Sequence, residues 1–227
     1  MQPVEVKFAD WFERGWNIFK DNAGLLVLSS LIVIALTLLT LGVLGGPLAA
    51  GMILIVLRLV DRAEPKPQAG DVFQGFQYFL QAFLFLLVYV VVDIVGSSIL
   101  MVVPLIGLLV SMAYSAALAA LLMFALFLIV DRKMDFWPAC MASVDKVKTN
   151  FWPFFGLALV LQVLTVAGLL VCFVGLLITV PLVYCVTAVA YRDVFATPAG
   201  AEAEVVEPQL DGPPTGLADA ENPPPLA

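Results

Sequence analysis

The chain contains no histidine and few charged residues, and both deficits narrow the classes of protein to which it can belong. Charged residues make up 13% of the sequence, whereas a soluble domain has about 25%. Histidine is the commonest metal ligand and the usual acid–base group near neutral pH, so its absence removes the simplest metal and hydrolytic sites. The three cysteines, Cys140, Cys172 and Cys185, form no CxxC pair and suggest no disulfide. We therefore expect no metal, no cofactor and no enzyme activity.

Three long stretches also lack charge almost entirely. They cover 22–57, 72–130 and 149–191, and the only acidic or basic residue within them is Asp93. A bilayer core about 30 Å thick takes roughly 20 helical residues to cross, so each stretch suits two spans joined by a turn. The sequence therefore predicts an integral membrane protein.

The basic residues predict its orientation. All 11 Lys and Arg fall within 1–21, 58–71, 131–148 or the stretch around Arg192. Basic residues in short loops remain in the cytoplasm, and three hairpins would place all four segments there. The middle stretch is long enough for three crossings, but an odd number would move the basic residues of 131–148 outside. We therefore predict six spans in a bacterial inner membrane, with both termini cytoplasmic.

Glycine and proline mark the outer turns of these hairpins. They are Gly42, Gly45, Gly46 and Pro47 in the first hairpin, Pro104 and Gly107 in the second, and Gly175 with Pro181 in the third. The spans are expected near 23–44, 46–60, 80–101, 107–130, 153–173 and 175–191. The second and sixth are short, which favours local thinning of the bilayer.

A segment before each hairpin has the pattern of an amphipathic helix in the cytoplasmic interface. In 7–20 one face carries Phe8, Trp11, Phe12, Ile18 and Phe19, and the opposite face is polar. The second segment, 71–83, begins with Asp71 and Gln74 at capping-box spacing, and the third runs from Asp135, a candidate N-cap, to Lys148. Each segment could instead form the first turns of the following span.

Each hairpin ends in charged residues, so the whole unit recurs three times. The three exits read Val60-Asp61-Arg62, Val130-Asp131-Arg132 and Tyr191-Arg192-Asp193. Their similar spacing suggests an internal threefold repeat. The alternative is that any hairpin protein ends its inward-running spans with charged residues at the cytoplasmic side, which explains the exits equally well without a repeat.

The last part of the chain has a different composition. Residues 196–227 are rich in Ala, Pro, Glu and Gly and contain no basic residue. With little apolar surface they are expected to form a disordered acidic cytosolic tail, which leaves 1–195 as the transmembrane domain. A protein partner bound through this tail, or a homo-oligomer, is a hypothesis based on its length and charge. The near-neutral remainder gives no reason to expect nucleic acid.

Asp93 is the one ionisable acid or base within the apolar stretches. Placing such a residue at the bilayer centre costs about 2.5 to 3.5 kcal/mol, so it is a functional candidate that needs a partner. The candidate partners are hydroxyls, among them Ser97, Ser98, Ser111 and Tyr114. Three interpretations remain open: Asp93 reaches water at the outer end of its span, it is hydrogen-bonded structurally, or it forms a cation or proton site.

Small and polar residues in two other spans suggest helix packing. In the fourth span Ser111, Ser115 and Ala119 repeat every four residues, which lets helix backbones approach closely and predicts a central place in the bundle. In the fifth span Gln162 and Thr165 favour hydrogen bonds between helices over a transport pathway.

Several short motifs resemble those of a known membrane-protein family. They are Gly15-Trp16-Asn17-Ile18-Phe19-Lys20-Asp21-Asn22, Gly45-Gly46-Pro47, Asn150-Phe151-Trp152, and Thr179-Val180-Pro181 with Ala190-Tyr191-Arg192-Asp193. Over about 8–194 the chain resembles uncharacterised bacterial six-helix membrane proteins related to the membrane domain of glycerophosphoryl diester phosphodiesterases. The resemblance implies a six-helix architecture and carries over no activity and no catalytic residue.

The sequence thus predicts an all-α, six-span transmembrane bundle of three hairpins with interfacial helices on its cytoplasmic face. Polar residues in the spans are few and suit packing, so we expect a non-enzymatic scaffold or lipid-associated module whose partners are membrane lipids. The alternative is a small transporter or channel that uses Asp93 in a cation or proton site.

Overall fold

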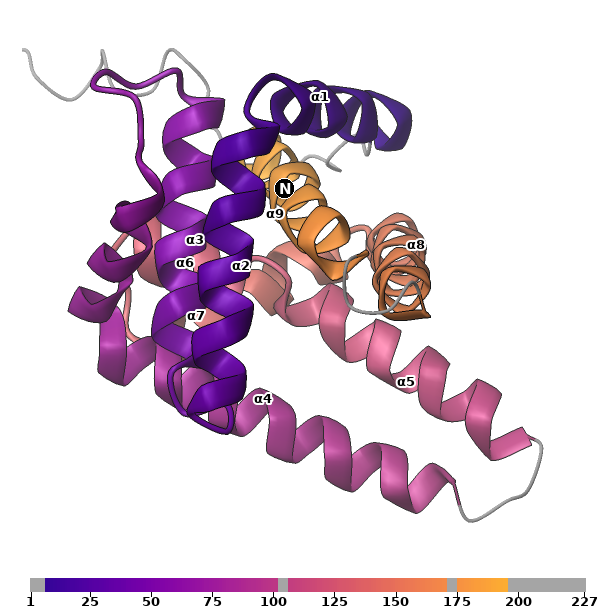
Figure 1. The fold of residues 1–227 in the computed structure, drawn as a ribbon. Helices are drawn as coiled ribbons and strands as arrows, with labels where there is room; N and C mark the ends of the chain where they lie inside the picture. Colours follow the sequence, from indigo (N-terminus) through magenta and orange to yellow (C-terminus); the bar gives the residue numbers. More distant parts are fainter. Residues whose placement is uncertain (1–6, 102–105, 171–174, 196–227) are drawn as a thin grey trace, which may run out of the picture. The chain divides into compact units, whose positions relative to one another are not determined.

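A computed structural model describes residues 7–101, 106–170 and 175–195, and the chain in these ranges is helical with no strand (Figure 1). The predicted tail, the turn at Pro104, Cys172 and the end of the fifth predicted span lie outside the described residues. The elements are α1 (Phe8–Asp21), α2 (Ala23–Leu39), α3 (Gly45–Val60), the 3-10 helix η1 (Ala69–Tyr78), α4 (Phe79–Leu100), α5 (Ile106–Leu122), α6 (Ala125–Asp131), α7 (Phe136–Lys148), α8 (Phe151–Leu170) and α9 (Leu176–Phe195).

Several of these helices are long and apolar enough to cross a membrane. Within the described ranges there are four by length and composition: η1 with α4, α5 with α6, α8, and α9. A fifth is added if α1 and α2, which are bent by 90° at their junction, count together. Helix α3 has 16 residues, or about 24 Å, and falls short of the bilayer core. The described part of the chain is therefore all-helical, with helices compatible with a multi-pass membrane protein.

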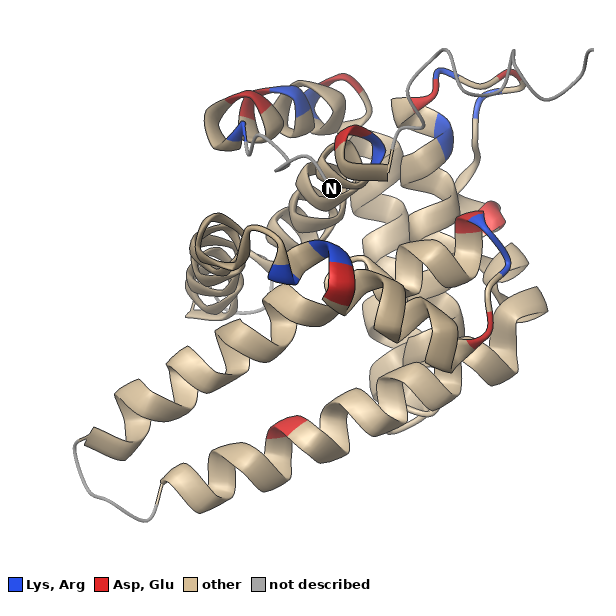
Figure 2. Cartoon of the chain, turned by 180° about the vertical axis from the view of Figure 1, so that it is seen from behind, with Lys and Arg blue, Asp and Glu red and all other residues tan. Residues whose placement is uncertain are grey.

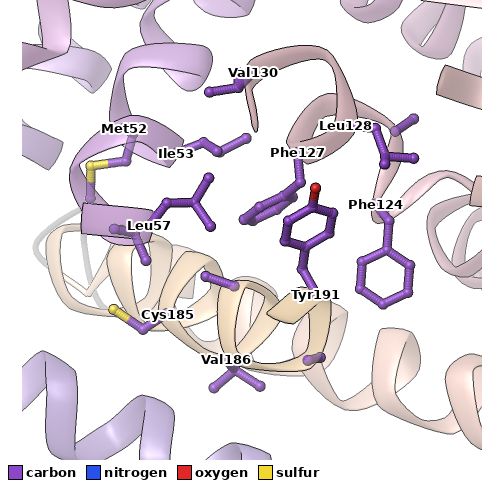
Figure 3. Packing of buried hydrophobic residues seen from close by; sticks show 14 of the residues in the cluster. Met52, Ile53, Leu57, Phe124, Phe127, Leu128, Val130, Cys185, Val186 and Tyr191 are labelled. Carbon is purple, nitrogen blue, oxygen red and sulfur yellow. The ribbon is translucent and has the colours of Figure 1, made fainter. Parts of the chain in front are cut away.

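The buried centre of the fold is formed by α3, α6 and α9 (Figure 3). The ring of Tyr191 stacks on Phe127 with centroids 5.4 Å apart, and Phe124 packs beside it at 6.2 Å. The second half of the fourth predicted span is α6 and belongs to this centre, whereas its first half, α5, packs against α4, α7 and α8. Ala116 and Ala120 of α5 are nevertheless fully buried.

Helix α3 and the 3-10 helix η1 pack through glycine. A Cβ added to Gly51 would overlap the carbonyl oxygen of Val72, and one added to Gly75 would overlap that of Pro47. Only residues without a side chain allow the two backbones to approach so closely. Arg58 of α3 also lies 3.4 Å from the Asp71 carboxylate of η1.

The second amphipathic segment begins differently from the prediction. It starts as a 3-10 helix at Ala69, and Gln68 is its N-cap. Asp71 takes the third position of the capping box and accepts a hydrogen bond from the Gln68 backbone N–H at 2.9 Å. Gln74 donates to the other oxygen of Asp71 at 2.7 Å. The observed capping box is formed by Gln68 and Asp71, one turn before the predicted pair of Asp71 and Gln74. The sequence does not indicate it, because glutamine is an unusual N-cap residue.

Two predicted spans also differ from the observed helices. The fourth is broken at Met123 and Phe124, between α5 and α6. The sixth is not short, because α9 has 20 residues and continues to Phe195. Pro181, predicted to mark a turn, lies buried inside α9. Proline is tolerated in apolar bundles where neighbouring helices support the freed backbone groups, so here it does not end the helix.

The amphipathic helix α1 buries part of its apolar face against the protein itself. Trp11 is fully buried and stacks on Phe154 of α8 at 6.1 Å, and Phe19 is also buried. A Cβ added to Gly15 would lie 2.9 Å from the backbone of Val186 in α9, so the two helices are in close contact. Trp11 and Phe19 thus stabilise helix packing and do not face the headgroups as predicted, whereas Phe8 remains exposed.

Candidate functional site

A cavity of about 400 Å³ lies among α3, α4, α5, α6, α8 and α9. Most of the side chains that line it are apolar, and alanines at Ala49, Ala119 and Ala158 contribute to its wall from three different helices. No Asp, Glu, Lys or Arg belongs to this lining, although every lining residue is among those the structure describes. Its size and apolar character are those of a site for a small lipophilic molecule.

A few polar groups converge on this cavity. They come from Tyr89, Ser115, Gln162, Thr165, Tyr184 and Thr187. The hydroxyls of Thr165 and Thr187 donate to carbonyls one turn earlier in their own helices, at 2.9 and 2.8 Å. The Oε1 atom of Gln162 is buried and accepts no hydrogen bond from any described residue. This acceptor is therefore shielded by neighbouring atoms and is not accessible from the cavity.

The helix break between α5 and α6 forms part of the cavity wall through Met123. Ser143 of α7 is fully buried beside this break. Its hydroxyl accepts a hydrogen bond from the Phe124 N–H at 3.3 Å and donates to the Leu121 carbonyl at 2.7 Å. One side chain thus satisfies backbone groups that the broken helix leaves free, as irregular backbone in an apolar setting requires.

Asp93 does not line the cavity, although Tyr89, one turn earlier on α4, does. The Oδ1 atom of Asp93 is buried and has no hydrogen-bond partner within the described part of the chain. Beside it, Tyr114 of α5 packs on Gly96 of α4, where an added Cβ would overlap the ring. The Tyr114 hydroxyl donates to the Val92 carbonyl at 3.1 Å.

The predicted partners of Asp93 are only partly brought together. Tyr114 lies near it, but Ser111 uses its hydroxyl on the Leu108 carbonyl of its own helix at 2.9 Å. Ser97 is half-buried and Ser98 is exposed. Any functional role for these residues stays a prediction. Ser115 and Ala119, predicted to pack helices, lie in the cavity wall.

The three charged exits meet in one ion-paired cluster, which we call the exit cluster (Asp61, Asp131, Tyr191, Arg192). The Arg192 guanidinium donates to both carboxylate oxygens of Asp61 at 2.9 and 2.6 Å. It also donates to Asp131 at 2.8 Å, and the Tyr191 hydroxyl donates to the same Asp131 oxygen at 2.7 Å. Bidentate, charge-assisted pairing of this kind fixes geometry as well as supplying energy. The sequence showed the exits but gave no sign that they converge.

Next to the exit cluster, α1 is attached to the end of α9. Asp193 accepts a hydrogen bond from the Trp11 indole N–H at 2.7 Å and forms an ion pair with Arg14 at 3.0 Å. Figure 2 shows charged residues on α1, on the last turns of other helices such as α7 and α9, and on the connections between helices, whereas α4 and α5 carry a single charged position. Charge and apolar surface are thus segregated.

No part of the described chain forms a metal centre. Among these residues no three His, Cys, Asp or Glu side chains lie close enough together to hold an ion. Cys140 and Cys185 are free and buried. Burial raises the pKa of Cys140, in α7, to about 11, which keeps the thiol protonated and unreactive near neutral pH.

Comparison with known proteins returns no relative for this chain. No protein-family model, curated protein or solved structure matches it. The resemblance to six-helix membrane proteins therefore stays a prediction, and the cavity and the exit cluster carry the functional argument.

Proposed function

We propose that the chain is a non-enzymatic, lipid-associated membrane module that holds a lipophilic molecule between its helices. The observation that carries this proposal is the apolar cavity of about 400 Å³, whose described lining contains no charged side chain. A cavity of this kind offers neither the charged groups nor the acid–base pair on which most catalysis depends. Membrane lipids are the partners that it fits.

The exit cluster supports a layout of six spans in three hairpins. Arg192 joins the ends of α3, α6 and α9 through Asp61 and Asp131, so these three ends lie on one face. Helix α1, bent by 90° from α2, suits a position along the membrane surface at that face. With the basic residues on this side, the positive-inside rule favours a cytoplasmic location for it and for both termini.

The start of α4 supports the same arrangement. Gln81, near the beginning of α4, donates to the Asp135 carboxylate at 2.9 Å and accepts a hydrogen bond from the Phe136 N–H at 2.8 Å. The segment from α4 to α6 thus begins and ends at the same face, as an even number of crossings requires. Gln81 also caps α7, whereas the Asp135 side chain makes no capping bond of its own.

The test combines lipid binding with solute flux. The full chain is purified in mild detergent and examined by native mass spectrometry for bound lipids, then reconstituted into proteoliposomes for flux of protons and alkali cations. We expect retained lipophilic adducts and flux equal to that of protein-free vesicles. Specific flux that heat-denatured protein does not show, together with an absence of adducts, would contradict the proposal.

A second candidate function, transport of a cation or proton, is favoured by one observation. The Oδ1 atom of Asp93 is buried without a partner among the described residues, in a helix with no other charged residue. Intramembrane carboxylates of this kind often lie on ion pathways. If Asp93 is part of a pathway, Asp93→Asn abolishes flux without changing thermal stability. Equal flux from wild type and Asp93→Asn would remove this candidate.

A further inference from the structure

We infer that Arg132, in the connection before α7, and Lys146, in the last turn of α7, form a site for the phosphate group of an anionic phospholipid. This site is separate from the apolar cavity, and it recognises a charged headgroup where the cavity would hold a lipophilic chain. Only its place at the membrane surface rests on the proposed layout. Three observations lead to it: the position of the two cations around Phe195, their lack of a carboxylate partner, and the exposed tryptophans of the same segment.

Arg132 and Lys146 converge on one aromatic ring from two parts of the chain. The Arg132 guanidinium lies 5.4 Å from the centroid of the Phe195 ring, and the Lys146 ammonium lies 5.9 Å from the same centroid. Arg132 also donates a hydrogen bond to the Phe195 carbonyl at 3.0 Å. The fold therefore holds two like charges near each other at the end of α9.

Neither cation is paired with a carboxylate. No ion pair within the described residues includes Arg132 or Lys146, whereas Arg192 close by is paired twice. Lys133 and Lys148 flank the pair in sequence, and both are exposed and equally without an ion pair among the described residues. Like charges that are held together without a counter-charge are unfavourable, and a bound anion relieves this repulsion.

The acidic residues of the same segment leave an excess of positive charge. Asp131 is already paired with Arg192. Asp135, which accepts a hydrogen bond from Gln81, and Asp145, which is exposed, set two negative charges against four positive ones. The segment from the end of α6 to the end of α7 is therefore net positive.

Exposed tryptophans indicate that the anion is a lipid. Trp137 of α7 is 67% exposed, and Trp152 at the start of α8 is 77% exposed. Trp137, Met141 and Lys148 are exposed at four- and seven-residue spacing, so they share one outward face of α7. Tryptophan is enriched where acyl chains meet headgroups. A soluble acidic partner would satisfy the cations and leave these indoles in water, whereas a phospholipid satisfies both.

The chemistry of the two cations favours a headgroup with net negative charge. A guanidinium binds phosphate oxygens through parallel hydrogen bonds, and an ammonium group binds them as a point charge. Phosphatidylglycerol offers its phosphate with no positive group beside it. Phosphatidylethanolamine carries an ammonium group that cancels the charge of its phosphate and is repelled by the two bases.

The experiment measures which headgroup the full chain retains. Protein in mild detergent is incubated with equal amounts of phosphatidylglycerol and phosphatidylethanolamine that have the same acyl chains, and bound lipids are counted by native mass spectrometry. Identical chains cancel the contribution of the apolar cavity. Arg132→Gln/Lys146→Gln removes both cations of the site. The matched control, Lys20→Gln/Lys66→Gln, removes two exposed lysines that form no ion pair with any described residue.

We expect the wild type to retain more phosphatidylglycerol than phosphatidylethanolamine. Arg132→Gln/Lys146→Gln should lower the ratio of the two bound lipids about 2- to 30-fold, as the loss of two partly exposed ion pairs implies. The control has lost the same net charge and should keep the wild-type ratio. Arg132→Lys/Lys146→Arg keeps both charges and should also keep the preference.

A second variant covers the case in which Arg132→Gln/Lys146→Gln does not fold, because Arg132 also contacts the end of α9. Lys133→Gln/Lys148→Gln changes only exposed side chains, and it should lower the ratio in the same direction.

The outcomes separate this inference from the proposed function. Equal retention of the two lipids by the wild type would overturn the inference, as would an unchanged ratio in the site variants or an equal loss in the control. Lipid that is still retained in those cases would support the proposed function. A wild-type chain that retains no lipid at all would contradict both.

Discussion

Replacing Arg192 with alanine should destabilise the bundle measurably, because this one side chain joins three helix ends. The substitution removes two hydrogen bonds to Asp61 and one to Asp131. Exposed ion pairs contribute about 0.2 to 1 kcal/mol each, and hydrogen bonds to buried charged groups contribute about 1.5 to 3 kcal/mol. The side chain of Arg192 is 30% exposed and that of Asp61 is 42% exposed, so solvent screening favours the lower range. We expect a loss of about 2 kcal/mol.

For a domain of this size a loss of 2 kcal/mol lowers the melting temperature by about 4 to 8 °C. The assay is thermal unfolding of the purified protein in one detergent, followed by tryptophan fluorescence and by size-exclusion chromatography of heated samples. Lys66→Ala is the matched control, since Lys66 is exposed and forms no ion pair with any described residue. Equal melting temperatures for Arg192→Ala and Lys66→Ala would refute the structural role of the exit cluster.

Three further predictions follow from the packing. Gly51→Ala should destabilise the protein by about 3 kcal/mol, because the new methyl group overlaps the Val72 carbonyl. The control Gly156→Ala adds a methyl group in open space and should not destabilise it. Similar melting temperatures for the two variants would contradict the close contact between α3 and η1. Trp11→Phe keeps the aromatic ring but loses the hydrogen bond to Asp193, and should cost about 1 kcal/mol; an unchanged melting temperature would show that this bond contributes nothing. In a variant that retains only Cys140, maleimide labelling should accelerate about tenfold per pH unit between pH 8 and pH 10, because the pKa of its thiol is raised to about 11. A rate that levels off between pH 9 and pH 10 would indicate an ordinary, exposed thiol.

The helical architecture could be predicted because apolar stretches leave the chain few alternatives. The stretches 22–57, 72–130 and 149–191 cover most of each long helix, and the amphipathic segments at 7–20 and 135–148 match α1 and α7 to within one residue. Boundaries were wrong where tertiary contacts override local signals. Pro181 continues α9 inside the core, and Ser143 from another helix supports a break within the fourth predicted span.

The candidate site was much less predictable, because it arises from the relative positions of residues far apart in the sequence. Gln162 was recognised as polar, but nothing in the sequence indicates that its Oε1 atom lacks a partner. Ala49, Ala119 and Ala158 look like packing residues one helix at a time, and only together do they border a cavity. Asp61 and Asp131 stand at the exits of their hairpins in the sequence, yet their shared contact with Arg192 depends on the fold.

The proposed layout, with the exit cluster on the cytoplasmic face, is tested most directly by locating the charged connections relative to the membrane. Fusions of green fluorescent protein and of alkaline phosphatase are made after positions 43, 133 and 195 in a bacterial host. The account predicts fluorescence without phosphatase activity at 133 and 195, which follow α6 and α9, and phosphatase activity at 43, between α2 and α3. Phosphatase activity at 133 or 195 would place part of the exit cluster outside the cytoplasm and contradict the proposed layout.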